Sequence, residues 1–509
     1  MPTYKTKTLD PPLGGLNRRN AYQWQKPYTT AYANNVVPFD QANGRGKIGT
    51  RPGLTAFASS PTGKPYNWCH ANYHNSGLKV GVAVTTENGC FVWDGSSWTA
   101  WITDPPGTDF STPTVIGQTL VMARGGTTTV YRTLASGSGG GGTALGSHPN
   151  ISGGSDPSGG TPPTGCGLAL THGSRLVLAG NTSDQQIVYL SRAANTFWDF
   201  DYAETDQSAA VALSFKEPVT ALLSHTRDCM LVGMTDSLDV VRGTETGAML
   251  IETLSHEVGP LMQSAWCHDA TGRLWLFTRD GLYTMQAGCG DSVESVSRES
   301  LPAELIAVNP GAGDKVSVGY DHRWRGLHII VNFASGTDVW FFFDLDSKGF
   351  WPATSSYTWN LVVPIKRSLT TAKSGTILMA TDSASYQWDR GSSESVAAYF
   401  AYGPIKLSDQ GHVGFLEDFT ARLSSGSGDV DYEIYAGHSP EEAYAALVAG
   451  TPIAFSGRLT IEGQSYHDNP MVSDECVYIK LKDVSSADWS HEGVDCGIRP
   501  TVGIVRAST

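Results

Sequence analysis

Five stretches of the chain repeat one pattern: a short apolar strand, a turn at Gly or Asp, and a second strand that ends on aromatic residues. Strand–turn–strand units that recur every several tens of residues are typical of radial all-β arrays such as the β-propeller. One unit cannot bury both faces of its small sheet, so neighbouring units must pack face to face. The repeat therefore predicts an all-β fold built around a β-propeller of about six blades. The five stretches are 81–98, 175–198, 272–283, 326–351 and 375–388, and a weaker copy spans 219–241.

Segments of different composition surround and interrupt these repeats. Residues 1–60 are rich in Pro and Gly and keep no helical or strand period, which predicts an extended N-terminal arm held by another surface. Residues 61–400 form the propeller, with a flexible insertion expected at 135–165, where almost every residue is Gly, Ser, Thr or Pro. Residues 401–509 contain alternating strands and a capping box that begins at Ser439. This last segment is expected to be a β-sandwich-like domain with one short helix.

Charge is distributed unevenly along the chain. The net charge is −14, but residues 1–51 contain eight Lys and Arg against two Asp, a balance of +6, which leaves −20 on the rest. The body therefore repels polyanions, and only the arm can dock onto an acidic surface. The alternative is that the arm charges keep an extended segment solvated. The arm residues expected to contact a partner are Arg18, Arg19, Trp24, Tyr28, Tyr32, Arg45, Lys47 and Arg51.

Membrane and redox signals are weak. No apolar run is long enough to span a membrane, and the first 15 residues lack the apolar segment of a secretory signal. We therefore expect assembly in a cytoplasm, without stable membrane insertion. The eight cysteines form no CxxC pair, and we interpret them as buried free thiols.

Candidate catalytic and metal motifs fail on their spacing. Cys69, His70, His74 and Cys90 are zinc-ligand types, but adjacent strand residues point to opposite faces. The stretch from Asp344 resembles a calcium loop, yet it has Lys at position five and Ser at position twelve, so a β-turn is expected. No Walker loop and no Gly-x-Ser-x-Gly elbow occurs. We expect no catalytic residue, metal or cofactor, and therefore no enzyme.

Short motifs at both ends of the chain resemble the tail proteins of short-tailed bacteriophages. The N-terminal motifs are Gly14-Gly-Leu-Asn17, Lys26-Pro-Tyr28, Ala33-Asn-Asn35 and Gly49-Thr-Arg-Pro-Gly53. The C-terminal motifs are Tyr402-Gly-Pro-Ile405, Phe419-Thr-Ala-Arg-Leu423, the SGSG turn within 424–428, Tyr432-Glu-Ile-Tyr435 and Ser439-Pro-Glu-Glu-Ala443. In this order they look like the nozzle, or tail-hub, component of such tails.

The resemblance implies a structural virion protein of the tail. It implies a homohexameric ring around the DNA exit channel below the portal and adaptor, with a role in DNA retention and ejection. The implied partners are further copies of the chain, the adaptor and portal proteins, and tail fibres or tailspikes, while DNA passes without specific binding. An acidic body agrees with such a channel because carboxylates repel phosphates. The alternatives are a carbohydrate-binding or carbohydrate-cleaving propeller at the virion tip, and a propeller scaffold for protein partners.

Overall fold

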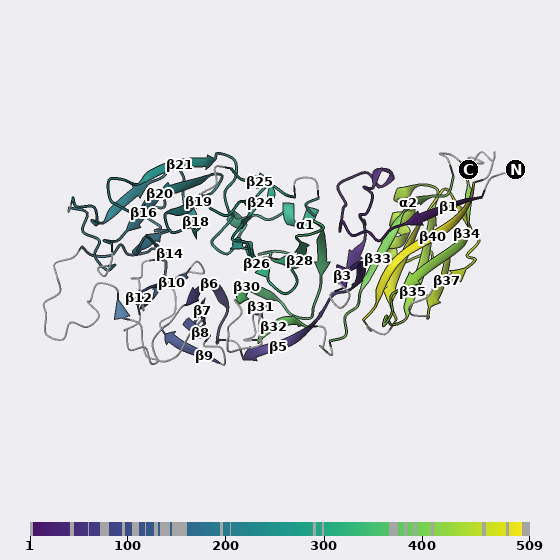
Figure 1. Ribbon diagram of the computed structural model, residues 1–509, viewed down its shortest axis with the longest axis horizontal. Helices are drawn as coiled ribbons and strands as arrows, with labels where there is room; N and C mark the ends of the chain where they lie inside the picture. Colours follow the sequence, from purple (N-terminus) through teal and green to yellow (C-terminus); the bar gives the residue numbers. More distant parts are fainter. Residues whose placement is uncertain are drawn as a thin grey trace.

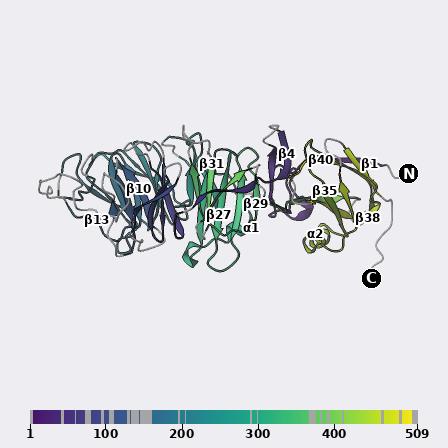
Figure 2. The ribbon, with the colours of Figure 1, turned by 90° about the horizontal axis from the view of Figure 1, so that it is seen from below.

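Strands dominate the computed structural model, and helices are few and short (Figure 1). Within the described residues the strands form seven four-stranded antiparallel sheets and two larger sheets. The small sheets lie at one end of an elongated molecule, and the larger ones lie at the other end, near both termini (Figures 1 and 2). The structure describes residues 4–40, 45–59, 61–71, 81–93, 97–103, 111–117, 119–126, 131–132, 143–144, 160–193, 197–203, 205–288, 292–297, 300–365, 375–380, 384–389, 392, 394–408, 412–460, 465–484 and 488–500.

The seven small sheets are the blades of a β-propeller, here numbered 1 to 7 in chain order. The first strand of each blade is the innermost one, because the first strands of neighbouring blades contact one another around a ring. Blades 4 and 5 share a buried apolar cluster, and blade 7 contacts blade 1, so the ring is closed. The innermost strands are β6 (Pro65–Ala71), β10 (Thr112–Ile116), β14 (Leu168–His172), β18 (Val219–Ser224), β22 (Trp266–His268), β26 (Lys315–Asp321) and β30 (Trp359–Ile365).

The second and third strands of each blade form its middle hairpin. The second strands are β7 (Gly81–Thr86), β11 (Thr119–Ala123), β15 (Arg175–Ala179), β19 (Cys229–Met234), β23 (Leu274–Thr278), β27 (Gly326–Asn332) and β31 (Gly375–Ala380). The third strands are β8 (Gly89–Trp93), β12 (Tyr131–Arg132), β16 (Ile187–Leu190), β20 (Leu238–Arg242), β24 (Gly281–Met285), β28 (Val339–Asp344) and β32 (Ala384–Asp389). Neighbouring blades cover both faces of these hairpins, which is why several read as unbroken apolar runs.

Six outer strands follow their blades in sequence, but the seventh comes from the N-terminal side of the propeller. There, β5 pairs with β32, and Leu54 lies opposite Trp388. The two ends of the propeller sequence are thereby hydrogen-bonded into one sheet, which ties the ring closed. The outer strands are β9 (Trp98–Ile102), β13 (Thr143–Ala144), β17 (Val211–Ser214), β21 (Leu250–Ser255), β25 (Glu294–Ser295), β29 (Phe350–Ala353) and β5 (Gly53–Ser59).

The predicted propeller is confirmed, but it has seven blades rather than about six. Each repeat found in the sequence lies at the middle hairpin of a blade, and the missed unit is blade 2. Its two outer strands have only two residues each, too few to show a period. One of them, β13, lies within the expected flexible insertion 135–165; of that insertion the structure describes only 143–144 and 160–165.

The two larger sheets and one helix form the C-terminal β-sandwich that the sequence predicts. A five-stranded sheet has the order β2-β33-β39-β35-β36, and a seven-stranded sheet has the path β3-β4-β40-β34-β37 with β1 and β38 paired alongside. Helix α2 (Pro440–Ala449) begins at Ser439, whose Oγ accepts the Glu442 N–H at 3.1 Å, as the capping box predicts. The strands from this part of the chain are β33 (Tyr399–Lys406), β34 (Gly414–Leu423), β35 (Val430–Gly437), β36 (Phe455–Leu459), β37 (Ser465–Asp468), β38 (Val472–Asp474), β39 (Cys476–Asp483) and β40 (Ser490–Pro500).

The N-terminal segment does not form a separate arm, contrary to our expectation for residues 1–60. Its strands add to the sandwich: β1 pairs with β40, β2 with β33, and the β3–β4 hairpin with β40. These N-terminal strands need few apolar residues to be ordered, because each one extends a sheet that already packs on a core. The last of its strands, β5, belongs to the propeller. The sandwich strands are β1 (Lys5–Leu9), β2 (Ala33–Asn34), β3 (Val36–Asp40) and β4 (Arg45–Thr50).

Propeller and sandwich share one apolar core. A single cluster of buried side chains includes Trp340 and Trp388 from blades 6 and 7 together with Phe400 and Trp489 from the sandwich. Trp340 and Trp388 lie with their ring centroids 5.7 Å apart, and Phe400 and Trp489 at 5.9 Å. Separating the two domains would expose this apolar surface to water, which is unfavourable. We therefore expect them to move as one body.

The structure also describes the cysteines, the stretch from Asp344 and the helices that the sequence analysis considered. Six of the described cysteines are free thiols, as expected, but Cys229 is disulfide-bonded to a partner outside the described residues. The stretch from Asp344 is a turn between β28 and β29, where the Asp344 N–H donates to the Gly349 carbonyl at 3.0 Å. No described helix has the length and apolar character needed to cross a membrane.

Candidate docking surface

Residues 11–35, here called the bridging segment, connect the sandwich to the propeller. The segment follows β1, passes blade 6 and returns to the sandwich at β2. It contains the short helix η1 (Tyr22–Trp24) and lies near the helices α1 (Ala303–Ile306) and α2 (Figure 1). A further short helix, η3 (Pro310–Ala312), follows α1. Five of the eight residues expected to contact a partner lie on the bridging segment.

Two glycines allow the bridging segment to lie directly on blade 6. Gly15 has a φ of +79°, and a Cβ on it would be 2.8 Å from the Cα of Gly349. The next residue, Leu16, donates its N–H to the Phe350 carbonyl at 2.9 Å and is buried in the core of blades 5 and 6. Gly14 has no room for a side chain either, because its Cβ would be 2.8 Å from the Tyr28 carbonyl. The Gly-Gly-Leu motif therefore fixes this segment to its own chain.

Arg18, which was expected to contact a partner, pairs with a carboxylate of its own chain. Its Nη1 lies 2.7 Å from Oε1 of Glu304 on α1, and its Nε donates to the Ala31 carbonyl at 3.1 Å. Arg19 lines a small cavity of about 320 Å³ with Glu257 and other residues of blade 5. The ion pair of Arg18 therefore holds the bridging segment to the propeller.

The aromatic residues at the tip of the bridging segment point into solvent. Trp24 is 73% exposed and Tyr28 is 59% exposed. All 14 tryptophans lie in the described part of the chain, and Trp24 is the only exposed one. Tyr28 also has a φ of +59°, which is rare for a bulky residue and is maintained only where the surroundings impose it. An exposed Trp on a strained loop is typical of a contact site.

Hydrogen bonds hold this tip in one shape. The Gln25 side-chain amide donates to the Asn17 carbonyl at 3.1 Å and to the Thr29 hydroxyl at 2.8 Å. The Thr29 hydroxyl donates in turn to the Lys26 carbonyl at 2.7 Å, and the Trp24 N–H donates to the Ala21 carbonyl. A rigid aromatic tip loses little entropy when it binds, which favours affinity.

Stacked tyrosines continue from the tip onto the sandwich. Tyr22 stacks on Tyr444 of α2 with ring centroids 4.3 Å apart, and Tyr32 stacks on Tyr399 at 4.8 Å. The ammonium of Lys480 lies 5.0 Å from the Tyr399 ring centroid. Tyr32 was expected to anchor the segment to a partner, but it is half-buried against its own chain. We call Trp24, Tyr28 and these half-buried tyrosines the aromatic surface.

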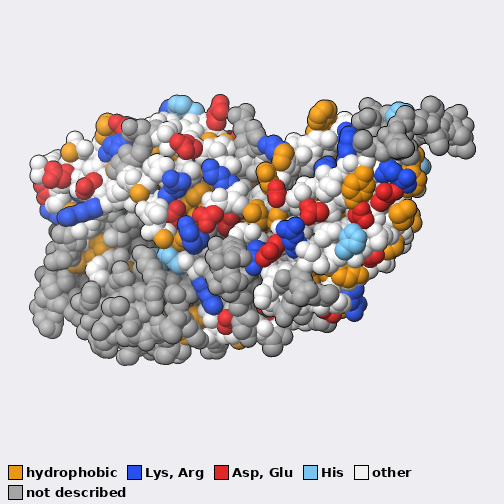
Figure 3. Space-filling model, turned by 45° about the vertical axis from the view of Figure 1, so that its right-hand side comes forward, with side chains coloured by type: hydrophobic (Ala, Val, Ile, Leu, Met, Phe, Trp, Pro, Cys, Tyr) orange, Lys and Arg blue, Asp and Glu red, His pale blue; other side chains and the backbone are white. Residues whose placement is uncertain are grey.

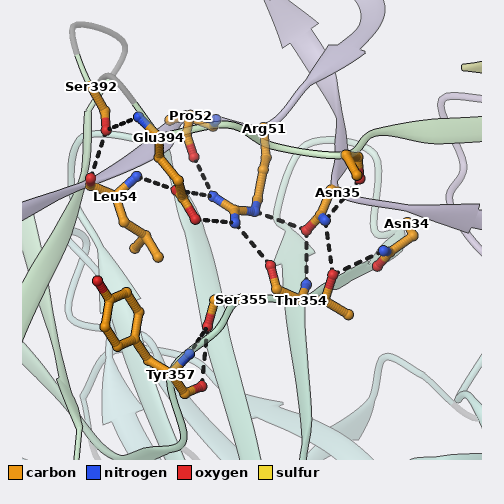
Figure 4. A network of polar contacts seen from close by, with 11 residues as sticks. Asn34, Asn35, Arg51, Pro52, Leu54, Thr354, Ser355, Tyr357, Ser392 and Glu394 are labelled. Atoms are coloured by element: carbon orange, nitrogen blue, oxygen red, sulfur yellow. Dashed lines mark hydrogen bonds and ion pairs between the residues drawn. The ribbon is translucent and has the colours of Figure 1, made fainter. Parts of the chain in front are cut away.

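The remaining predicted contact residues lie away from the aromatic surface. Lys47 is buried and pairs with Glu492 at 3.3 Å. Arg51 is buried at the junction of the two domains, where Glu394 is its ion-pair partner (Figure 4). Burial lowers the pKa of Arg51, and the hydrogen bonds that its guanidinium donates to Glu394 oppose that shift. The side chain of Arg45 lies outside the described residues.

Sequence reasoning missed the residues that the C-terminal half adds to this surface. Tyr399, Tyr444 and Lys480 are separated from the bridging segment by more than 350 positions, and no local pattern connects them. Elsewhere on the surface, one view shows apolar side chains scattered among acidic and basic ones, without a single large apolar patch (Figure 3). Across the described residues, no group of three or more His, Cys, Asp or Glu side chains could hold a metal ion. Chemically, the aromatic surface offers two exposed rings beside half-buried tyrosines and the Lys480 ammonium.

Comparison with known proteins yields structural likeness only. No protein-family model matches the chain, and no curated protein matches it. The extracellular domain of the one-component system BT4673 from B. thetaiotaomicron is 14% identical, with a TM-score of 0.30; the match covers 69% of this chain and 56% of that one. The corresponding domain of the two-component system BT3049 is 9% identical, covers 95% and 63%, and has a TM-score of 0.39. The exo-β-1,3-galactanase of Phanerochaete chrysosporium is 9% identical, covers 88% and 100%, and has a TM-score of 0.26.

Proposed function

We propose that this chain is a structural subunit of a short phage tail, which assembles with further copies into a ring-shaped nozzle around the DNA exit channel. The ring lies below the portal and adaptor and takes part in retaining and releasing DNA. The aromatic surface of the bridging segment is the contact through which the subunit docks onto a neighbouring ring protein. The subunit carries out no catalysis in this role.

The observation that carries the proposal is the exposed pair Trp24 and Tyr28 on a hydrogen-bonded tip. Trp and Tyr are enriched among the residues that dominate the binding energy of interfaces, and here both lie exposed on one rigid loop. The motifs that resemble phage tail proteins occur in the same segment, at 14–17 and 26–28. The shared core of propeller and sandwich agrees with this role, since a ring subunit must keep its shape.

The acidic body supports the same role. Outside residues 1–51 the chain carries a net charge of −20, so its surface disfavours phosphate contacts. DNA can then pass a ring of such subunits without binding to it. We make no assignment of individual acidic residues to a channel lining.

A binding measurement with the adaptor protein of the same particle tests the proposal. We expect the purified chain to co-migrate with adaptor rings in size-exclusion chromatography, and the double variant Trp24→Ala/Tyr28→Ala to lose this binding by about 100-fold or more. Tyr202→Ala is the matched control, because Tyr202 is also exposed but lies on blade 3, away from the bridging segment. Equal binding by the double variant and the control would overturn the assignment of this surface.

A further inference from the structure

A second concave site lies on the propeller, away from the bridging segment. It is a cavity of about 540 Å³ between the turns that follow the innermost strands of blades 3 and 4. Residues 171–174 form one wall, residues 224–228 form the opposite wall, and Thr244 from blade 4 completes the lining. A cavity of this size accommodates a small organic molecule.

Every residue that lines this cavity is polar or Gly. Several of their functional groups have no partner within the described part of the chain: the guanidinium of Arg227, the carboxylate of Asp228, and the hydroxyls of Ser174 and Ser224. Because these four side chains are exposed and have no partner among the described residues, they can form hydrogen bonds to a ligand. The set contains donors and acceptors in similar number, and the adjacent charges of Arg227 and Asp228 cancel.

The walls of the cavity are held rigidly. Arg175, which is fully buried just below, donates to the Thr244 carbonyl at 2.9 Å, to the Ser191 carbonyl at 2.8 Å and to the Ala209 carbonyl at 2.6 Å. Gly173 approaches Thr244 so closely that a Cβ on it would be 2.3 Å from the Thr244 Cγ2. The site is therefore formed in advance of any ligand, which reduces the entropy cost of binding.

Two histidines in the lining are also fixed in place. Nε2 of His172 contacts the Gly243 carbonyl at 3.2 Å, and Nε2 of His225 contacts the Gly288 carbonyl. A carbonyl accepts only, so Nε2 carries the proton in both rings, and each Nδ1 keeps a lone pair. Burial lowers the pKa of both histidines, which favours their neutral forms at pH 7. The Nδ1 of His225 lies 3.4 Å from Nε2 of His268, so of these two rings only His172 offers a ligand an acceptor, and neither contributes charge.

We propose that this cavity binds a neutral carbohydrate, with Arg227 donating to sugar hydroxyls and Asp228 accepting from them. Sugar hydroxyls both donate and accept hydrogen bonds, as this lining requires. A phosphate is disfavoured because the carboxylate of Asp228 lies beside the only lining cation, Arg227. A nucleobase is disfavoured because the lining offers no apolar wall or Phe, Tyr or Trp ring. The proposal is independent of the tail role and of the aromatic surface.

Saturation-transfer NMR with glucose, galactose, mannose and N-acetylglucosamine tests the site on the full chain. We expect at least one of these sugars to bind, and Arg227→Ala and Asp228→Asn each to weaken that binding about tenfold, since each removes a hydrogen bond to a charged group. The matched control is Arg279→Ala, which removes another exposed propeller cation outside the cavity. Thermal unfolding of each variant establishes that the fold is retained.

Three results would overturn the proposal. The first is that none of the four sugars binds the wild-type chain. The second is that Arg227→Ala binds as well as Arg279→Ala does. The third is that inorganic phosphate displaces the bound sugar at equal concentration, because the cavity would then be an anion site.

Discussion

Arg51 and Glu394 form a bidentate ion pair where the chain passes between the sandwich and the propeller (Figure 4). The distances are 3.2 Å from Nη1 to Oε2 and 3.1 Å from Nη2 to Oε1. Nη2 also donates to the Thr354 carbonyl of blade 6 at 2.9 Å, and Nε donates to Oδ1 of Asn35 at 2.9 Å. The Arg51 side chain is only 1% exposed, and through these bonds it connects the sandwich to the propeller.

Removing one member of this pair is expected to be costly. Glu394→Ala leaves a buried guanidinium without its counter-charge, so we expect the free energy of unfolding to fall by about 3–5 kcal/mol. The double variant Arg51→Met/Glu394→Ala removes both charges and should lose less than the sum of the single variants. Chemical denaturation measures all three values.

An exposed pair provides the control. Arg325 and Asp346 lie 3.3 Å apart, with side chains 70% and 65% exposed. Asp346→Ala should change the free energy of unfolding by no more than about 1 kcal/mol. A loss in Glu394→Ala as small as in this control would show that the domain junction does not depend on the ion pair between Arg51 and Glu394.

The contact between Gly15 and Gly349 predicts a second effect. In Gly15→Ala, alanine must adopt a positive φ and place its Cβ 2.8 Å from the Gly349 Cα, and both are unfavourable. We therefore expect this variant to lower the melting temperature and to loosen the bridging segment. Gly247→Ala has a similar φ of +81° but nothing within 4 Å of its Cβ. The difference between the two variants in thermal unfolding isolates the steric contribution. If both variants melt alike, blade 6 does not hold the bridging segment tightly.

The strands that are long and buried could be predicted from the sequence, and the short ones could not. The pattern at 326–351 is clear because β27 and β28 are buried along almost their whole length, and β28 contains four consecutive aromatic residues. β2 has two residues and pairs Ala33 with Phe400, so no local period reveals it. Part of the aromatic surface was predicted. Trp24 and Tyr28 were identified from the sequence, whereas Tyr444 comes close to them only in the folded chain.

His491 predicts how stability depends on pH. This residue is fully buried in the sandwich, and burial lowers its pKa to about 3, an effect that a backbone contact with Arg422 only partly opposes. The pKa of an unfolded-chain His is about 6.5, so the unfolded state binds the proton more readily. The contribution of His491 to stability should be constant above pH 6.5 and fall as the pH drops toward 3, by up to about 1.4 kcal/mol per pH unit.

His491→Leu should therefore flatten the acid side of the stability curve. We expect this variant to gain stability relative to wild type progressively below pH 6.5, as measured by urea denaturation at a series of pH values. His256→Leu, at an exposed position, is the control and should retain the wild-type slope. If His491→Leu and wild type lose stability in parallel between pH 6.5 and 4, His491 is not the group responsible.

Native mass spectrometry tests the central claim most directly, because a nozzle subunit must assemble into a closed ring. At micromolar concentration, alone or mixed with the adaptor protein, the chain should give a species of six times its 54.4-kDa mass. The Trp24→Ala/Tyr28→Ala variant should not join the complex with the adaptor. A wild-type chain that remains a 54.4-kDa monomer both alone and with the adaptor would contradict the proposed function.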